Sequence, residues 1–132
     1  MAGPFARIIM SLSIVFLITA LVFNATANIL LKVGAGRVSS LEGLSLLDKG
    51  LALLSNLPLV LGLILFASNV AFYFLALRAI RISVAYPIMT GGGLAIITIA
   101  SYFFLREQID MLQTAGIVLI AAGIVMVASR MG

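Results

Sequence analysis

The sequence contains no cysteine and no histidine, and only four of its 132 residues are acidic. Without thiols it can build neither a disulfide framework nor a thiolate metal site, and without imidazole it lacks the usual general base and the commonest metal ligand. Few acidic side chains are therefore available for catalysis: Glu42, Asp48, Glu107 and Asp110. We therefore predict a protein that is not an enzyme and that binds no metal and no cofactor.

Charged residues of either sign are scarce as well, at 9% of the chain against 64% hydrophobic residues. A soluble domain is about 25% charged and 45–50% apolar, and a chain of this size could not bury so much apolar surface. We predict a single all-α domain, residues 1–132, that is integral to a membrane. The net charge of +4 does not indicate nucleic acid as a partner, because the basic residues stand at the ends of apolar runs, where Lys and Arg reach lipid head groups.

Four uncharged apolar runs have about the 20 residues that a transmembrane helix needs. They predict helices at about 8–31, 56–77, 82–105 and 111–129. In the connector between the first two, at 33–49, the run Gly34-Ala35-Gly36 is expected to end the first helix. Leucines then recur at helical spacing as far as Leu54, which predicts either a short amphipathic helix at the membrane interface or an N-terminal extension of the second span.

Polar residues within the first two spans follow helical spacing. Asn24 and Asn28 share one face of the first helix with Lys32, and Asn69 and Tyr73 share one face of the second. Because buried amides are costly in lipid, these faces should point into the helix bundle. For Asn24 and Asn28 this predicts either hydrogen bonding between helices or a surface that faces a substrate. For Asn69 and Tyr73 it predicts core packing with a satisfied amide, and the alternative is again contact with a substrate.

The third span combines polar residues with residues that weaken a helix. Tyr86 and Thr90 lie one turn apart on one face, and Pro87 lacks the N–H that would bond the carbonyl one turn earlier. Three glycines follow: Gly91, Gly92 and Gly93. We expect the proline and the glycines to let this helix bend, as alternating access requires; the alternative is that small residues only permit close packing.

Two arginines and two glycines complete the candidate set. Arg78 and Arg81 flank the tight loop between the second and third spans, where arginine serves as a membrane anchor and topology signal. The alternative is a clamp for a phosphate group, since Arg binds phosphate oxygens bidentately. Gly116 and Gly123 stand seven residues apart in the fourth span, a spacing of small residues that predicts an oligomer interface.

The triplet Ala85-Tyr86-Pro87, the glycine run and the loop 106–110 resemble the third helix and following loop of small four-helix members of the drug/metabolite transporter superfamily. Two branches are similar: the small multidrug resistance exporters, and the small flippase subunits that move aminoarabinose linked to undecaprenyl phosphate. The triplet and the long first connector are more like the flippase-type subunits, whereas the spacing of the two glycines in the fourth span resembles the pairing motif of the exporters. Aligned on Leu30-Leu31-Lys32, the membrane-embedded glutamate of the exporters falls at Asn24, so the chain departs from that family at its central proton- and cation-binding residue.

The resemblance implies a transporter of the inner (cytoplasmic) membrane that acts as a homodimer or as a heterodimer with a similar subunit. The resemblance to the flippase-type subunits implies translocation of a lipid-linked substrate, such as a polyprenyl-phosphate sugar, or of another amphipathic molecule. The resemblance to the exporters implies proton-coupled export of small cationic or drug-like compounds. A third alternative is a membrane assembly subunit that transports nothing. The absence of Asp, Glu, His, Lys and Arg from all four spans favours the flippase. The substrate-binding candidates are Asn24, Asn28, Asn69, Tyr73, Arg78, Arg81, Tyr86 and Thr90.

The basic residues do not decide the orientation in the membrane. With four spans, one side carries Arg7, Arg78, Arg81 and Arg130, and the other carries Lys32, Arg37, Lys49 and Arg106. An equal count permits insertion in both orientations or an orientation fixed by a partner subunit.

Overall fold

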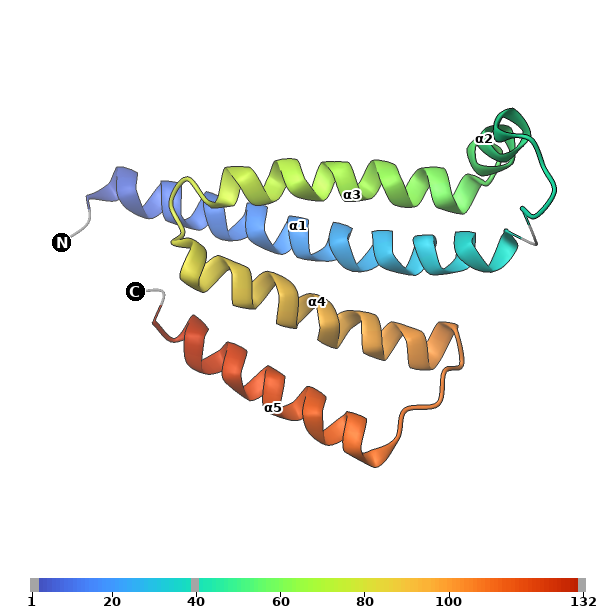
Figure 1. The fold of residues 1–132 in the computed structure, drawn as a ribbon. Helices are drawn as coiled ribbons and strands as arrows, with labels where there is room; N and C mark the ends of the chain where they lie inside the picture. The colour runs from blue at the N-terminus through green and yellow to red at the C-terminus, as the bar shows by residue number, and fades with distance from the viewer. Residues whose placement is uncertain (1–2, 39–40, 131–132) are drawn as a thin grey trace.

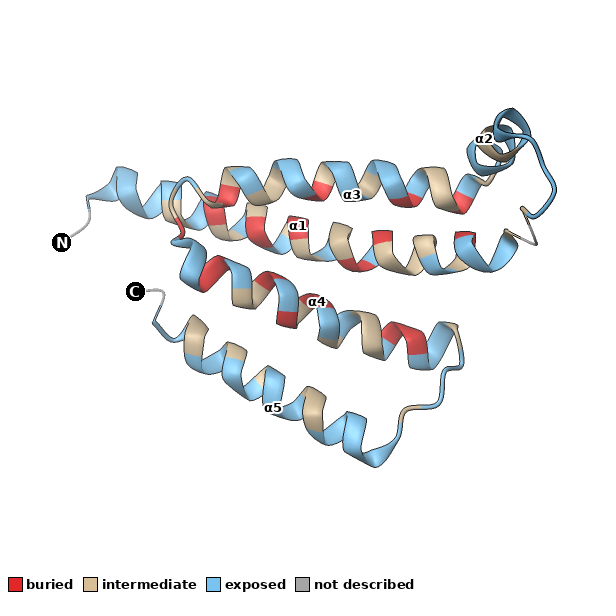
Figure 2. Cartoon of the chain, in the orientation of Figure 1, coloured by how far each residue is buried: buried red, intermediate tan, exposed pale blue. Residues whose placement is uncertain are grey.

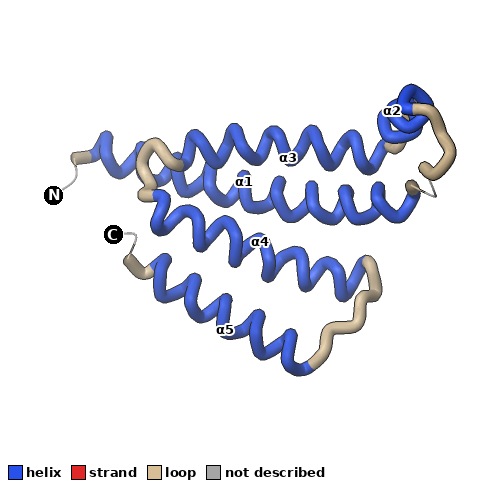
Figure 3. The backbone as a smooth tube through the Cα atoms, in the orientation of Figure 1, coloured by secondary structure: helices blue, strands red, loops and turns tan. Residues whose placement is uncertain are grey.

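The structure, a computed structural model, describes residues 3–38 and 41–130, and over these residues it is built from helices and loops (Figures 1 and 3). In chain order, α1 spans Pro4–Arg37, α2 Leu46–Leu54, α3 Leu57–Ala76, α4 Ile82–Phe104 and α5 Met111–Ala128. All except α2 are long and apolar enough to cross a membrane. The predicted all-α membrane fold with four spans is therefore confirmed. Positions 39–40 of the predicted connector, and the two ends of the predicted domain, lie outside the described residues.

The helices alternate in direction, with α1 between α3 and α4, and α5 on the outer side of α4 (Figure 1). The start of α1, the α3–α4 loop and the end of α5 share one end of the molecule. The α1–α2 connector and the α4–α5 loop share the other end. This arrangement places the two sets of basic residues at opposite ends, as four membrane spans require.

Small residues at heptad spacing line the buried faces of α1 and α3. They are Ser13, Ala20, Ala27 and Gly34 on α1, and Gly62, Asn69 and Ala76 on α3. A Cβ added at Gly62 would lie 3.1 Å from the side chain of Leu31 and 3.2 Å from the carbonyl oxygen of Ala27. In lipid, helices associate through packing rather than through the hydrophobic effect, so small residues stabilise the pair by letting the backbones approach.

The first helix is longer than the predicted 8–31, and it continues through the run Gly34-Ala35-Gly36, which was predicted to end it, as far as Arg37. A Cβ at Gly34 would lie 2.9 Å from the backbone nitrogen of Leu59, and the Nδ2 of Asn56 donates to the Gly34 carbonyl at 2.8 Å. The glycine therefore serves the close approach of α3. Tertiary contact sustains helical backbone at a residue whose intrinsic propensity favours a helix end.

The leucine-rich part of the connector forms a separate helix, α2, rather than an extension of α3. Its N-cap is Ser45, whose Oγ accepts from the Asp48 backbone N–H at 3.2 Å and donates to the Asp48 carboxylate at 2.7 Å. The chain then turns, and Asn56 caps α3 by accepting from the Leu59 N–H at 3.3 Å. Pro58 follows in the first turn, where its missing N–H is harmless. As a result α2 lies across the end of α3 (Figure 1).

α4 continues without a break through Pro87 and the glycine run. A Cβ at Gly91 would collide with the Ile124 side chain of α5, and one at Gly92 would lie 3.0 Å from the Leu21 side chain of α1. The glycines thus admit a neighbouring helix on each side, which favours the close-packing alternative. Bending of this helix stays a prediction.

Candidate functional site

The polar face predicted on α1 turns toward α4. The Nδ2 of Asn28 donates to the Asn24 carbonyl at 2.8 Å and lies 3.3 Å from Asn24 Oδ1, so the two amides are tied together along the helix. A Cβ at Gly93 would lie 3.0 Å from Asn24 Nδ2, so this glycine makes room for the amide. One turn beyond Asn28, the Nζ of Lys32 pairs with Glu107 Oε1 at 3.2 Å. The face therefore runs from the packed middle of α1 to an ion pair at the end of the bundle.

Asn69 and Tyr73 face inward from α3. Asn69 is 5% exposed, and within the described part of the chain neither its Oδ1 nor the Oη of Tyr73 has a hydrogen-bond partner. The contact of Gly62 with Ala27 sets an antiparallel register that places Asn69 opposite residues 20–24 of α1. An unpaired buried polar atom costs about 1–3 kcal/mol. A hydrogen-bond donor supplied from outside the protomer would relieve this cost.

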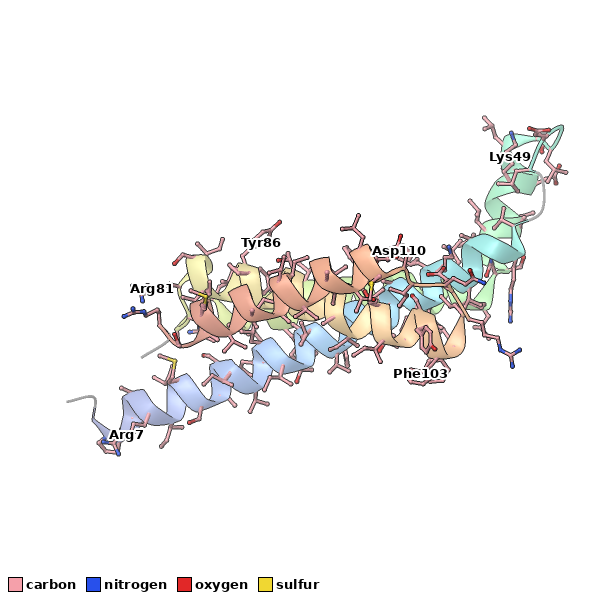
Figure 4. All side chains as sticks on the ribbon, turned by 90° about the horizontal axis from the view of Figure 1, so that it is seen from below. Arg7, Lys49, Arg81, Tyr86, Phe103 and Asp110 are labelled. Atoms are coloured by element: carbon pink, nitrogen blue, oxygen red, sulfur yellow. The ribbon has the colours of Figure 1, made fainter. Side chains whose placement is uncertain are left out.

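Tyr86 and Thr90 do not join the inward group. Tyr86 is 59% exposed, and Figure 4 shows it projecting outward from the bundle. Thr90 is also exposed, and its Oγ1 donates to the Tyr86 carbonyl at 2.9 Å within the same helix. These two side chains are therefore placed to contact lipid, a substrate or a second subunit, and not the interior of this protomer.

Arginines gather at the end of the molecule that holds both termini, opposite Lys49 (Figure 4). Arg78 lies in the turn after α3 and Arg81 is the N-cap residue of α4. The Nη2 of Arg81 donates to the Arg130 carbonyl at 3.3 Å, which ties the start of α4 to the end of α5. All four acidic residues of the sequence belong to the opposite end, so the charged side chains of this end are all basic.

Gly116 and Gly123 lie on open surface of α5. A Cβ added at either would meet nothing within 4 Å, and α5 is the one long helix with no buried residue among those described (Figure 2). The close contact of α5 with α4 uses other residues, such as Ile120 and Ile124 against Gly91. The glycine pair is thus available for a contact outside the protomer, and its role in an oligomer stays a prediction.

Three polar interactions between distant parts of the chain were not predicted from the sequence. The Lys32–Glu107 ion pair joins α1 to the α4–α5 loop, Asn56 bonds both its own helix and α1, and Arg81 bonds the Arg130 carbonyl. None follows from periodicity, because each depends on which ends of the helices meet. The heptad spacing of Ser13, Ala20 and their successors on α1 was a readable signal for the α1–α3 contact, and it was missed.

Comparison with known proteins identifies the family. A family model described as Small Multidrug Resistance protein matches residues 49–120. Among curated proteins, the uncharacterized protein y4nH of Sinorhizobium fredii (strain NBRC 101917 / NGR234) is 33% identical over 107 residues, which are 80% of this chain and 85% of that protein. The uncharacterized membrane protein YvaE of Bacillus subtilis (strain 168) is 26% identical over 111 residues, 84% of this chain and 80% of that protein. No solved structure matches.

The family match decides which branch of the superfamily the chain belongs to. It names the multidrug resistance branch, and it begins at Lys49, so it leaves out α1 and the position of Asn24. Members of this family are transporters rather than enzymes, and the inner membrane is their usual location. With four apolar helices long enough to span a bilayer, this chain is a multi-pass membrane protein that belongs to the Small Multidrug Resistance protein family.

Proposed function

We propose that this chain translocates an amphipathic substrate with a polar, hydrogen-bonding head group, of which a polyprenyl-phosphate sugar is one example, by a flippase-like route. The observation that carries the proposal is the unpaired Asn69 Oδ1 and Tyr73 Oη inside the α1–α3 pair. Both atoms can accept a hydrogen bond, and the tyrosine can also donate. A hydroxyl-rich head group offers the donors that they lack.

The energy source is the second element of the proposal. Exchange of a proton for a cation needs a group inside the membrane that titrates near neutral pH, and the uncharged runs 8–31, 56–77, 82–105 and 111–129 contain no Asp, Glu, His, Lys or Arg. Asn24 stands where the resemblance places the exporters' glutamate, and it is held by Asn28 and by the close approach of Gly93. An amide there can orient a substrate but cannot exchange a proton.

Arg78 and Arg81 support the lipid-linked form of the proposal. They lie at the end of the molecule to which no Asp or Glu side chain belongs, where a phosphate group would meet basic side chains. Guanidinium groups bind phosphate through paired hydrogen bonds. We place the phosphate of the substrate against these two arginines and its sugar toward Asn69.

A second subunit is part of the proposal, because the candidate residues divide into an inward group and an outward group. Tyr86 and Thr90 would complete the polar pathway only if another protomer faced them. The open Gly116 and Gly123 surface offers a separate contact for a homodimer or a heterodimer. A subunit that only assembles with a partner and transports nothing is the alternative that this exposed helix favours.

The second candidate function is proton-coupled export of small cationic or drug-like compounds. The family match over residues 49–120 favours it. It would require a titratable group from a partner, since this chain places all its carboxylates outside the spans.

Transport in reconstituted vesicles tests the proposal. A fluorescent polyprenyl-phosphate sugar should cross the bilayer faster with the protein than without it, and Asn69→Ala and Tyr73→Phe should slow the crossing. Thr26→Val is the matched control, because it also removes a hydroxyl from a span, but one already bonded to the Val22 carbonyl at 2.8 Å. Proton-coupled uptake of small cations without lipid movement would reject the flippase and support the second candidate.

A further inference from the structure

The outer surface of α4, near its C-terminal end, carries a ridge between two apolar grooves. Ile99 and Phe103 stand one turn apart, 60% and 71% exposed, and Figure 4 shows Phe103 projecting from the side opposite Tyr86. Both residues line a cavity of about 270 Å³ shared with Ile117 and Val118 of α5. Both also line a second cavity, of about 620 Å³, on the α4 surface. Two apolar grooves therefore flank one ridge.

The groove between α4 and α5 exists because the two helices diverge toward their loop (Figure 1). At the other end Gly91 lets Ile124 approach the α4 backbone closely. Near the loop α4 instead carries the bulky Tyr102 and Phe103. Small residues at one end and aromatic rings at the other therefore leave a wedge-shaped space between α4 and α5, which is widest near their loop.

The groove between the helices adjoins a polar pocket at the loop. A cavity of about 190 Å³ shares Thr98 and Ile109 with that groove, and its polar lining is Ser101, Glu107, Gln108 and Gln113. The one charged residue in this lining is the carboxylate Glu107, whose partner Lys32 is 3.2 Å away and 64% exposed. The pocket thus places the carboxylate of Glu107, which can bind a cationic group, beside the ammonium of Lys32, which can bind an anionic group.

We propose that this wedge is a binding site for a two-chain zwitterionic aminophospholipid, phosphatidylethanolamine in chemical class, held as a resident lipid apart from the transport pathway. Its acyl chains straddle the Ile99/Phe103 ridge, one in each groove. Its ammonium group donates to Glu107 and to the amide oxygens of Gln108 or Gln113, and its phosphate faces Lys32. An ammonium carries three N–H donors, whereas the quaternary group of phosphatidylcholine carries none.

The site does not depend on the proposed function, because none of its residues belongs to the eight substrate candidates. The complementarity is one of charge and of shape together. A lipid with a purely anionic head group would face Glu107 with charge of the same sign, and a single-chain amphiphile would leave one groove empty.

Lipid retention by the purified protein tests the proposal. The protein is titrated in dodecyl maltoside with phosphatidylethanolamine, phosphatidylcholine or phosphatidylglycerol of identical chains, and native mass spectrometry counts the bound lipid. Phosphatidylethanolamine should bind about tenfold more tightly than phosphatidylcholine, as expected for charge-assisted hydrogen bonds. Equal binding of the two lipids would overturn the proposal.

Two pairs of variants locate the site. Glu107→Gln and Lys32→Gln both break the ion pair, but only Glu107→Gln should abolish the preference for ethanolamine over choline. Thr98→Leu fills the junction of groove and polar pocket and should reduce binding of every phospholipid; Thr26→Leu, on the exposed face of α1, should not. Far-UV circular dichroism checks that each variant is folded. An unchanged preference in folded Glu107→Gln, or unchanged binding in folded Thr98→Leu, would contradict the assignment.

Discussion

Replacing Gly34 with alanine tests whether backbone contact between α1 and α3 stabilises this protein. The new Cβ would lie 2.9 Å from the backbone nitrogen of Leu59, and backbone cannot move aside as a side chain can. The helices must separate, and the hydrogen bond from Asn56 to the Gly34 carbonyl, now 2.8 Å, must stretch. Gly36 is the matched control, because it lies in the same helix and a Cβ there would meet nothing within 4 Å.

The expected magnitude follows from three contributions. Alanine is about 1 kcal/mol more favourable than glycine inside a helix, so Gly36→Ala should leave the free energy of unfolding unchanged or raise it by up to this amount. At Gly34 the same gain is opposed by overpacking, about 1–3 kcal/mol, and by a weakened hydrogen bond, about 0.5–1.5 kcal/mol. We expect Gly34→Ala to lower the free energy of unfolding by about 2 kcal/mol.

Unfolding can be followed by far-UV circular dichroism during titration with sodium dodecyl sulfate, since the chain contains no tryptophan to report by fluorescence. The two variants are compared in the same detergent at the same protein concentration. If Gly34→Ala is as stable as Gly36→Ala, the close approach of α3 to α1 contributes nothing and the account of the longer α1 fails.

Three further predictions concern the contacts outside this pair of helices. Gly116→Leu with Gly123→Leu should reduce crosslinked dimers in lipid, and an unchanged dimer fraction would exclude this surface as the interface. A double-mutant cycle on Lys32 and Glu107 should give a coupling of less than about 1 kcal/mol, since both side chains are well exposed; a larger value would show that the pair is shielded by lipid or by a partner. Pro87→Ala restores an N–H inside α4 and should raise thermal stability while slowing transport, whereas unchanged transport would argue against bending at this position.

The four spans were predictable because lipid imposes one requirement on every residue of a span. All backbone polar groups must bond within the segment, and the side chains must tolerate hydrocarbon. Long uncharged runs therefore located α3, α4 and α5 to within about one or two residues. The spacing of Asn24 and Asn28 predicted hydrogen bonds between helices or a substrate-facing surface, whereas the bond that the structure shows joins the two residues within α1, so both alternatives stay predictions.

What could not be predicted depended on which helices meet. Glycine carries the same intrinsic preference at Gly34 and at Gly36, yet only the first touches α3. Tyr86 and Thr90 share a face by spacing, but spacing does not say whether that face turns toward α1 or away from it. Pairs such as Lys32 and Glu107 are 75 residues apart in the sequence, and only the direction of the helices brings them together.

The buried faces of this protein contain no large side chain that is fully enclosed among the described residues, and alanine and glycine supply much of what is buried. Its tolerance to substitution should therefore be the reverse of that of a water-soluble domain. Apart from buried residues such as Leu17, truncating a leucine or a phenylalanine removes volume from an exposed or half-buried side chain, where lipid chains can refill the space. Enlarging a buried alanine instead forces two helices apart, and lipid cannot compensate for that. A scan that introduces leucine, rather than alanine, at successive positions is the experiment that would outline the core of this molecule.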